Sequence, residues 1–123
     1  MRSALHRLCI SISLTLMLLM ALAPSAWAHA ILMESKPALN SSVKGPDVAV
    51  WLRFNVRVDG GRSRVELVAP DGSHQSLALA KQSRPDILQS QASGLKPGTY
   101  KLIWNVLAAD GHMSKGEVPF TVT

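Results

Sequence analysis

Hydrophobic and polar residues alternate along residues 48–55 of this chain. Valine, leucine and phenylalanine occupy every second position from Val48 to Phe54, and alanine, tryptophan, arginine and asparagine occupy the positions between. Because successive side chains of a β-strand point to opposite faces, this period of two predicts a half-buried strand. Trp51 has the opposite parity, so we expect it to be more exposed than the apolar face.

Similar short patterns follow, separated by turn signals. We expect strands over 64–68, 75–79, 99–107 and 116–122, and turns at Gly60-Gly61, Pro70-Asp71-Gly72-Ser73 and Leu95-Lys96-Pro97-Gly98. Trp104 shares its parity with Leu102 and Val106, which favours burial. Pro119 is out of phase with Val118 and Phe120, which indicates a strand edge or a bulge.

No segment after residue 28 has a sustained helical period, and glycine or proline recurs about every ten residues. This spacing is typical of a small all-β domain, a Greek-key β-barrel or sandwich of immunoglobulin-like or cupredoxin-like appearance. Residues 80–93 are the least patterned, and we expect an ordered loop there with one short strand. We find no internal repeat and no long linker, so one domain is predicted.

The first 28 residues have the pattern of a secretory signal peptide. Basic residues at positions 2, 6 and 7 precede an apolar stretch, Leu8 to Ala23, which Pro24 ends before the small-x-small site Ala26-Trp27-Ala28. The alternative is a retained membrane anchor, for which the stretch is slightly short. We expect cleavage after Ala28, a mature domain over residues 29–123 and a periplasmic location.

Cleavage changes the composition in two ways. The only cysteine, Cys9, leaves with the leader, so the mature domain has neither a disulfide nor a thiolate. Lys plus Arg falls from 13 to 11 against 8 acidic residues, which is a mild basic excess. The sequence has no basic run interleaved with aromatic residues, so nucleic acid is not an expected partner.

Cleavage would also make His29 the first residue. Its α-amine and its Nδ1 could then chelate a metal together. Asp110 and His112 are two residues apart, so in an extended strand their side chains would share a face, with Gly111 between them. Three nitrogens and a carboxylate oxygen suit Cu(II), and without thiolates the set is poor for Cu(I). The alternative is that Asp-Gly marks an ordinary hairpin turn and that the histidines are incidental.

The mature segment resembles the CopC family of periplasmic copper-binding proteins. The residues that carry this resemblance lie at both ends of the mature segment and in its middle: His29-Ala30-Ile31-Leu32-Met33-Glu34-Ser35-Lys36-Pro37-Ala38, Trp51-Leu52-Arg53-Phe54, Leu95-Lys96-Pro97-Gly98-Thr99-Tyr100, Trp104, and Ala109-Asp110-Gly111-His112 with Gly116. The resemblance implies a Greek-key β-fold that binds one Cu(II) per mature chain through His29, Asp110 and His112. It also implies a role in copper tolerance or uptake beside a CopD-type membrane protein.

Two departures from the family pattern bear on the site. Many members have an acidic residue after the phenylalanine of the central strand, where this chain has Asn55. Some members have a methionine-rich segment for Cu(I), but residues 73–91 contain no methionine, and Met33 and Met113 are the only two in the mature segment. We therefore expect a protein specific for Cu(II).

The remaining candidate residues have ordinary roles in this interpretation. We expect His74 to lie on an exposed turn, Met113 to pack beside the site, and Glu34 and Glu117 to be surface charges. We expect a monomeric carrier and no enzyme. The alternatives are an oxidative copper enzyme of the histidine-brace type and a metal-independent β-sandwich interaction module.

Overall fold

The computed structural model describes residues 1–21 and 29–123. It has one helix, α1 (Arg2–Ala21), and its strands are β1 (Leu32–Lys36), β2 (Ser42–Val43), β3 (Val48–Phe54), β4 (Val58–Val68), β5 (His74–Ser76), β6 (Ile87–Ala92), β7 (Gly98–Ala108) and β8 (Met113–Val122). The predicted cleavage site, 26–28, and Pro24 lie outside the described residues. In the described part of the chain, we find no helix with the length and hydropathy needed to cross a membrane.

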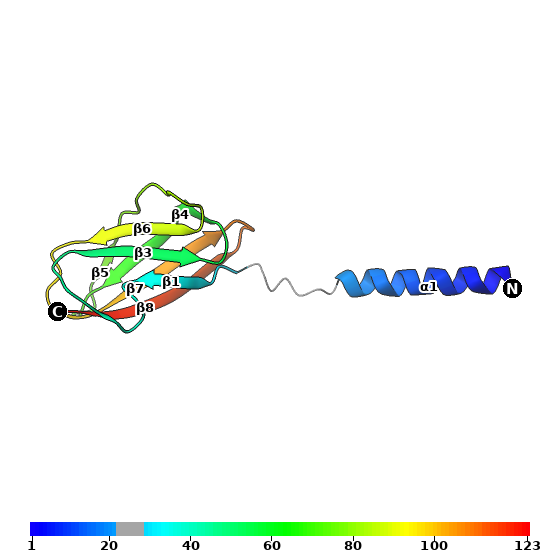
Figure 1. Cartoon of the computed structure of the whole chain (residues 1–123), viewed down its shortest axis with the longest axis horizontal. Coiled ribbons are helices and arrows are strands. Elements are labelled where there is room, and N and C mark those ends of the chain that lie inside the picture. The colour runs from blue at the N-terminus through cyan, green and yellow to red at the C-terminus, as the bar shows by residue number, and fades with distance from the viewer. Residues whose placement is uncertain (22–28) are drawn as a thin grey trace.

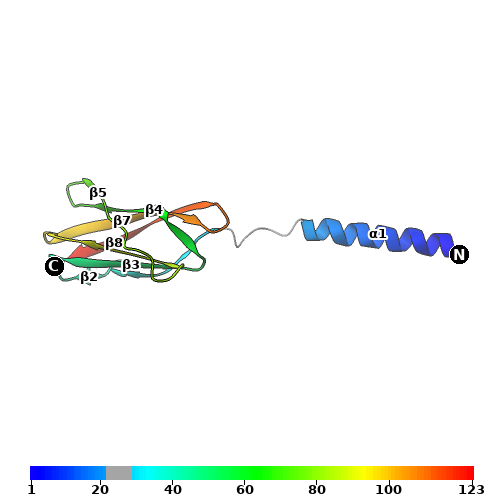
Figure 2. The same cartoon turned by 90° about the horizontal axis from the view of Figure 1, so that it is seen from above.

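The strands form two sheets packed face to face (Figures 1 and 2). One sheet has the order β1-β3-β6 and the other has the order β2-β8-β7-β4-β5. Strands distant in sequence are neighbours in both sheets, β3 beside β6 and β4 beside β7, which is a Greek-key arrangement. The all-β prediction is confirmed as a sandwich, and the sheets do not close into a barrel.

The alternating pattern of residues 48–54 becomes the central strand of the smaller sheet. In β3 the apolar parity is buried, with Leu52 and Phe54 almost fully covered. Trp51, on the other parity, is half-buried beneath the ammonium group of Lys36, 5.7 Å from the ring centroid. The strand prediction is therefore confirmed. In a strand, a period of two places the apolar residues on one face of the sheet and the residues between them on the other face.

The core between the sheets comes from alternate residues of the long strands. It includes Trp104, whose parity predicted burial, and its ring packs edge-on against Phe54 at 5.2 Å between centroids. The buried core side chains are those of Ala30, Val48, Val50, Leu52, Phe54, Val58, Val65, Leu67, Leu77, Leu88, Ala92, Leu95, Tyr100, Leu102, Trp104, Val106, Ala108, Val118, Phe120 and Val122. The sandwich between residues 30 and 122 therefore has a hydrophobic core of its own.

Pro119 lies where β8 has an open side. β2 pairs with β8 only at Thr121 and Val122, and the carbonyl of Pro119 accepts the N–H of Asn40 at 2.7 Å on the side away from β7. A residue's N and O point to the same side of a strand, so the missing N–H of Pro119 breaks no bond to β7. β8 itself lies between β2 and β7 and is not an edge strand, and its pairing with β7 has no bulge at Pro119. The prediction holds only locally, because Pro119 lies beyond the two-residue pairing with β2.

The turn predicted at Gly60-Gly61 is wrong. Both glycines lie within β4, where the pairing with β7 shifts register between Asp59 and Arg64. The Asp59 carboxylate accepts the N–H groups of Gly61 and Arg62 at 2.9 and 3.1 Å, so a side chain stabilises an irregularity within a continuing strand. The strand expected over 75–79 is shorter and begins at His74, whereas the short strand expected within 80–93 is present as β6.

Candidate metal centre

Asp110, Gly111 and His112 lie in the hairpin turn between β7 and β8. The N–H of Gly111 donates to the Ala108 carbonyl, and the Ala108 N–H donates to the His112 carbonyl, both at 2.9 Å. Gly111 has a φ of +87°, which closes this short loop and which residues with a Cβ rarely adopt. The extended conformation expected for residues 110–112 is therefore wrong, because turn chemistry determines the local backbone.

The turn nevertheless brings the two predicted side chains together. The Asp110 Oδ1 accepts the His112 N–H at 3.0 Å, and its Oδ2 lies 3.3 Å from the His112 Nδ1. The backbone N–H of His112 is the largest influence that lowers the pKa of Asp110 below its usual value, with smaller contributions from the His112 and His29 side chains. Asp110 is therefore an anionic oxygen donor at neutral pH, next to an imidazole.

His29 reaches this hairpin from the other end of the domain sequence. Its ring lies 5.8 Å from that of His112 between centroids, with an interplanar angle of 67°. A ligating ring nitrogen lies about 2.1 Å from its metal, so two rings on one ion have centroids within roughly 6 Å of each other. The two imidazoles are thus close enough to share an ion.

The three predicted residues are neighbours, although their side chains do not converge on one point. Within the described part of the chain, no three His, Cys, Asp or Glu side chains form a metal-holding group. The pair His112 and Asp110 is in direct contact, and His29 faces the histidine of that pair. An ion bound by all three would require these exposed side chains to move.

Two residues that bind the backbone directly after His29 were not singled out for this role from the sequence. The Asn55 Oδ1 accepts the Ile31 N–H at 2.7 Å, and the Ser114 Oγ accepts the Ala30 N–H at 3.0 Å. The only sequence signals were that Asn55 replaces an acidic family residue and that Ser114 lies two residues after His112. Neither signal reveals a contact with residues 30 and 31.

The other candidate residues lie apart from this centre or differ from expectation. His74 is exposed at the start of β5, as expected, with its Nδ1 3.2 Å from Glu66. Met113 is 51% exposed, so the packing role predicted for it is wrong. Glu34 and Glu117 are exposed, as expected, and pair with Arg53 and Lys101 at 3.4 and 3.2 Å.

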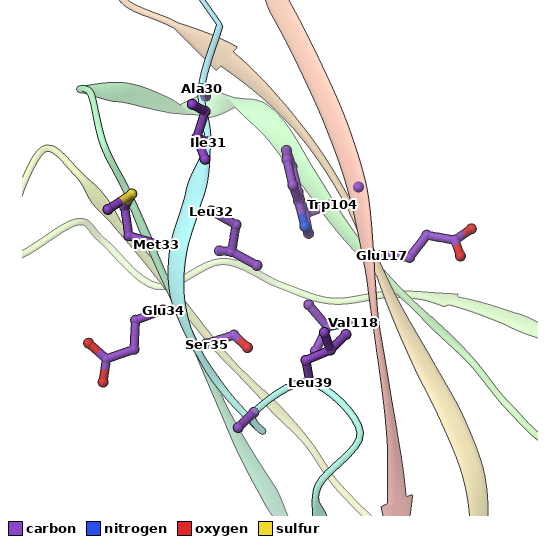
Figure 3. A pocket seen from close by; sticks show the side chains of 12 residues that line it. Ala30, Ile31, Leu32, Met33, Glu34, Ser35, Leu39, Trp104, Glu117 and Val118 are labelled. Carbon is purple, nitrogen blue, oxygen red and sulfur yellow. The ribbon is translucent and has the colours of Figure 1, made fainter.

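An apolar groove of about 620 Å³ runs between β1 and β8 beside the centre (Figure 3). The Trp104 ring lines its inner wall, and a Cβ on Gly116 would collide with that ring. The carboxylates of Glu34 and Glu117 point outward in Figure 3. The groove therefore supplies mainly apolar surface, and the candidate metal ligands lie outside it, at the hairpin and at His29.

The chain is similar to several known proteins. Protein YobA of Escherichia coli K12 is 36% identical over 102 residues, which cover 80% of this chain and 82% of YobA. Copper resistance protein C of Xanthomonas campestris pv. juglandis is 29% identical over 106 residues, covering 80% of this chain and 83% of that protein.

Solved structures agree with this similarity. The crystal structure of CopC from Methylosinus trichosporium OB3b has a TM-score of 0.69 and 28% identity, covering 76% of this chain and 93% of that one. The crystal structure of PcoC, a methionine-rich copper resistance protein from Escherichia coli, has a TM-score of 0.65 and 26% identity, covering 78% of this chain and 100% of that one. Residues 32–123 match the family model of the CopC domain. The resemblance noted in the sequence is thus confirmed, and the chain belongs to the CopC domain family.

Proposed function

We propose that this chain is a periplasmic protein that binds one Cu(II) and sequesters or carries it. Membership of the CopC domain family and similarity to copper resistance proteins support a copper-related function. The observation that carries the finer proposal is the placement of the His29 ring 5.8 Å from that of His112, whose Nδ1 lies 3.3 Å from the Asp110 carboxylate.

The proposed ligands are His29, Asp110 and His112. After cleavage behind Ala28, His29 would add its α-amine to its imidazole, so that the centre offers three nitrogens and one anionic oxygen. This donor set suits Cu(II), whereas Cu(I) prefers thiolates and thioethers. Because the amine and the imidazoles must be unprotonated to bind, the affinity should fall as the solution becomes acidic.

We propose capture and delivery of copper, and no catalysis. An oxidative enzyme of the histidine-brace type needs an open equatorial position for oxygen, and the Asp110 carboxylate beside His112 would occupy it. A CopD-type membrane protein is the proposed partner for delivery, and the copper-binding chain is proposed to act as a monomer. Copper in this scheme is cargo, so the centre must release it as well as hold it.

The decisive experiment is electron paramagnetic resonance of one equivalent of Cu(II) added to the processed protein. The protein is made from the full-length chain in a host that exports it, and mass spectrometry verifies that it begins at His29. The matched control has one additional residue before His29, which removes the α-amine from the chelate and leaves every side chain in place. We expect a tight axial spectrum with nitrogen couplings that the control loses or alters.

Three outcomes would contradict the proposal. Identical weak spectra from both proteins would remove His29 from the site and leave residues 110–112 as an ordinary hairpin turn. Tight binding accompanied by hydrogen peroxide production with ascorbate would favour the oxidative enzyme. Cooperative folding without any affinity for copper would favour the interaction module.

A further inference from the structure

The residues that follow the proposed ligand His29 lie outside the regular strand ladder, and side chains supply part of their attachment. We call residues 29–31 the N-terminal arm. The regular pairing of β1 with β3 ends at Leu32 and Phe54, one residue beyond the arm. There the Asn55 side chain accepts the Ile31 N–H at 2.7 Å, while the Asn55 N–H donates to the Ile31 carbonyl at 3.0 Å. Asn55 therefore binds both main-chain groups of Ile31.

The second attachment comes from the other sheet. The hydroxyl of Ser114, near the start of β8, accepts the Ala30 N–H at 3.0 Å, and the Ala30 side chain is only 5% exposed. Asn55 directly follows β3 of the smaller sheet, so the arm is fastened to both sheets at the end of the sandwich where the β7–β8 hairpin lies (Figure 1). These contacts fix the backbone directly after His29, whose ring lies 5.8 Å from that of His112.

The same hydrogen bonds have a consequence for copper chemistry. At the free end of a flexible peptide, Cu(II) binds the terminal amine and then the next backbone amide nitrogens, which give up their protons to become ligands. In this arm the next two amides, those of Ala30 and Ile31, both donate hydrogen bonds to side-chain oxygens. Either amide could join the metal only if its hydrogen bond were broken, which would leave a serine or asparagine oxygen without that donor.

We propose that Asn55 and Ser114 are positioning residues that determine how Cu(II) is coordinated. They keep the amide nitrogens of Ala30 and Ile31 out of the coordination shell and hold His29 beside His112. Copper is thereby directed to imidazole and carboxylate ligands, which can exchange during delivery more readily than amide nitrogens. This inference rests on the proposed function, in which His29 is a Cu(II) ligand.

The test compares Cu(II) spectra at a single pH for processed wild-type protein and for variants of the two residues. The variants are Asn55→Ala, Ser114→Ala and their combination. Ser114→Thr keeps an acceptor oxygen, and Asn105→Ala, an exposed asparagine on β7, is the matched control. Amide hydrogen exchange at Ala30 and Ile31 in the copper-free proteins provides a readout that does not depend on the metal.

We expect wild type, Ser114→Thr and Asn105→Ala to give one Cu(II) species. The combined variant should give a second species with an additional nitrogen ligand and a visible absorption band at shorter wavelength, because an amide nitrogen is a strong-field donor. Exchange of the two arm amides should become roughly tenfold faster, as expected for the loss of a hydrogen bond. If the combined variant does not fold, Ser114→Ala alone should show the second species, since it releases the amide next to His29.

The outcomes separate this inference from the function on which it rests. Faster exchange with an unchanged copper spectrum would make Asn55 and Ser114 simple structural anchors and would overturn the inference alone. A wild-type protein that does not bind Cu(II) would overturn the proposed function and this inference with it. A second species in Asn105→Ala would also contradict the inference, because that residue does not contact the arm.

Discussion

Two hairpin turns of this sandwich share their local chemistry and differ in their surroundings. One turn joins β4 to β5 around Asp71-Gly72, and the other joins β7 to β8 around Asp110-Gly111. The glycines have φ values of +83° and +87°, and each aspartate Oδ1 accepts the N–H two residues later at 3.0 Å. The two turns lie at opposite ends of the sandwich (Figure 2).

The two turns differ in the side chains that lie next to their histidines. After the first turn, His74 contacts Glu66 of the neighbouring strand at 3.2 Å. After the second, His112 contacts Asp110 and also faces His29 from the N-terminal arm. An aspartate, a glycine and a histidine in one turn are therefore insufficient for the proposed centre, and the arm is the additional element.

The largest expected effect on Cu(II) affinity comes from replacing the histidine that follows the β7–β8 turn, compared with the histidine that follows the β4–β5 turn. His112→Ala should weaken Cu(II) binding more than about 100-fold, because it removes a proposed ligand, whereas His74→Ala should leave the affinity unchanged within about twofold. A competition titration with a chelator of known affinity measures both. Equal losses in the two variants would mean that copper binds the two hairpins alike.

The aspartates provide the second comparison. Asp110→Asn keeps the size of the side chain and its acceptor oxygen but removes the negative charge, so Cu(II) affinity should fall at least about tenfold. Asp71→Asn makes the same change in the other turn and should not alter the affinity. The same titration tests this pair, and an unaffected Asp110→Asn variant would exclude the carboxylate as a ligand.

Alanine variants of the two glycines test whether the two turns contribute equally to the stability of the copper-free protein. A Cβ added at Gly72 or at Gly111 would have no neighbour within 4 Å, so backbone strain at positive φ is the only expected cost. Each alanine variant should lower the free energy of unfolding by about 1 kcal/mol, measured by urea denaturation of the copper-free protein. Gly111→Ala alone should also change the Cu(II) spectrum, and a spectral change in Gly72→Ala would be unexpected.

The smallest effect is the pH dependence of the copper-free protein. Hydrogen bonds from the Ser73 side chain and backbone lower the pKa of Asp71, and mainly the His112 backbone N–H lowers that of Asp110, in both cases below the usual 3.8. Each carboxylate therefore stabilises the fold fully above pH 3.8, and this contribution is lost as the pH falls through the lowered value. Carboxyl-carbon NMR titration should place both midpoints below 3.8, and a midpoint above it at either residue would contradict the turn geometry.

Local sequence patterns were sufficient to predict the buried face of a regular strand that packs against the core. The alternation over residues 48–54, and the parity that Trp104 shares with Leu102, predicted their buried faces correctly because side-chain direction in a strand depends only on position. The same reasoning failed at Gly60-Gly61. There the Gln82 side chain and the Asp59 carboxylate accept the backbone N–H groups of the two glycines, so the strand continues through them. A local sequence pattern does not predict such side-chain contacts.

The sequence by itself determined the all-β class, the faces of the long strands, the family, and which residues are candidates for copper. The class and the strand faces follow from periodicity, the copper candidates follow from residue type, and the family follows from the resemblance of its motifs. Only the tertiary structure decided that the ring of His29 lies beside that of His112 and that Asn55 and Ser114 fasten the arm. The Ala30–Ser114 hydrogen bond joins residues 84 positions apart, and such a contact depends on how the two sheets pack, which no local pattern encodes.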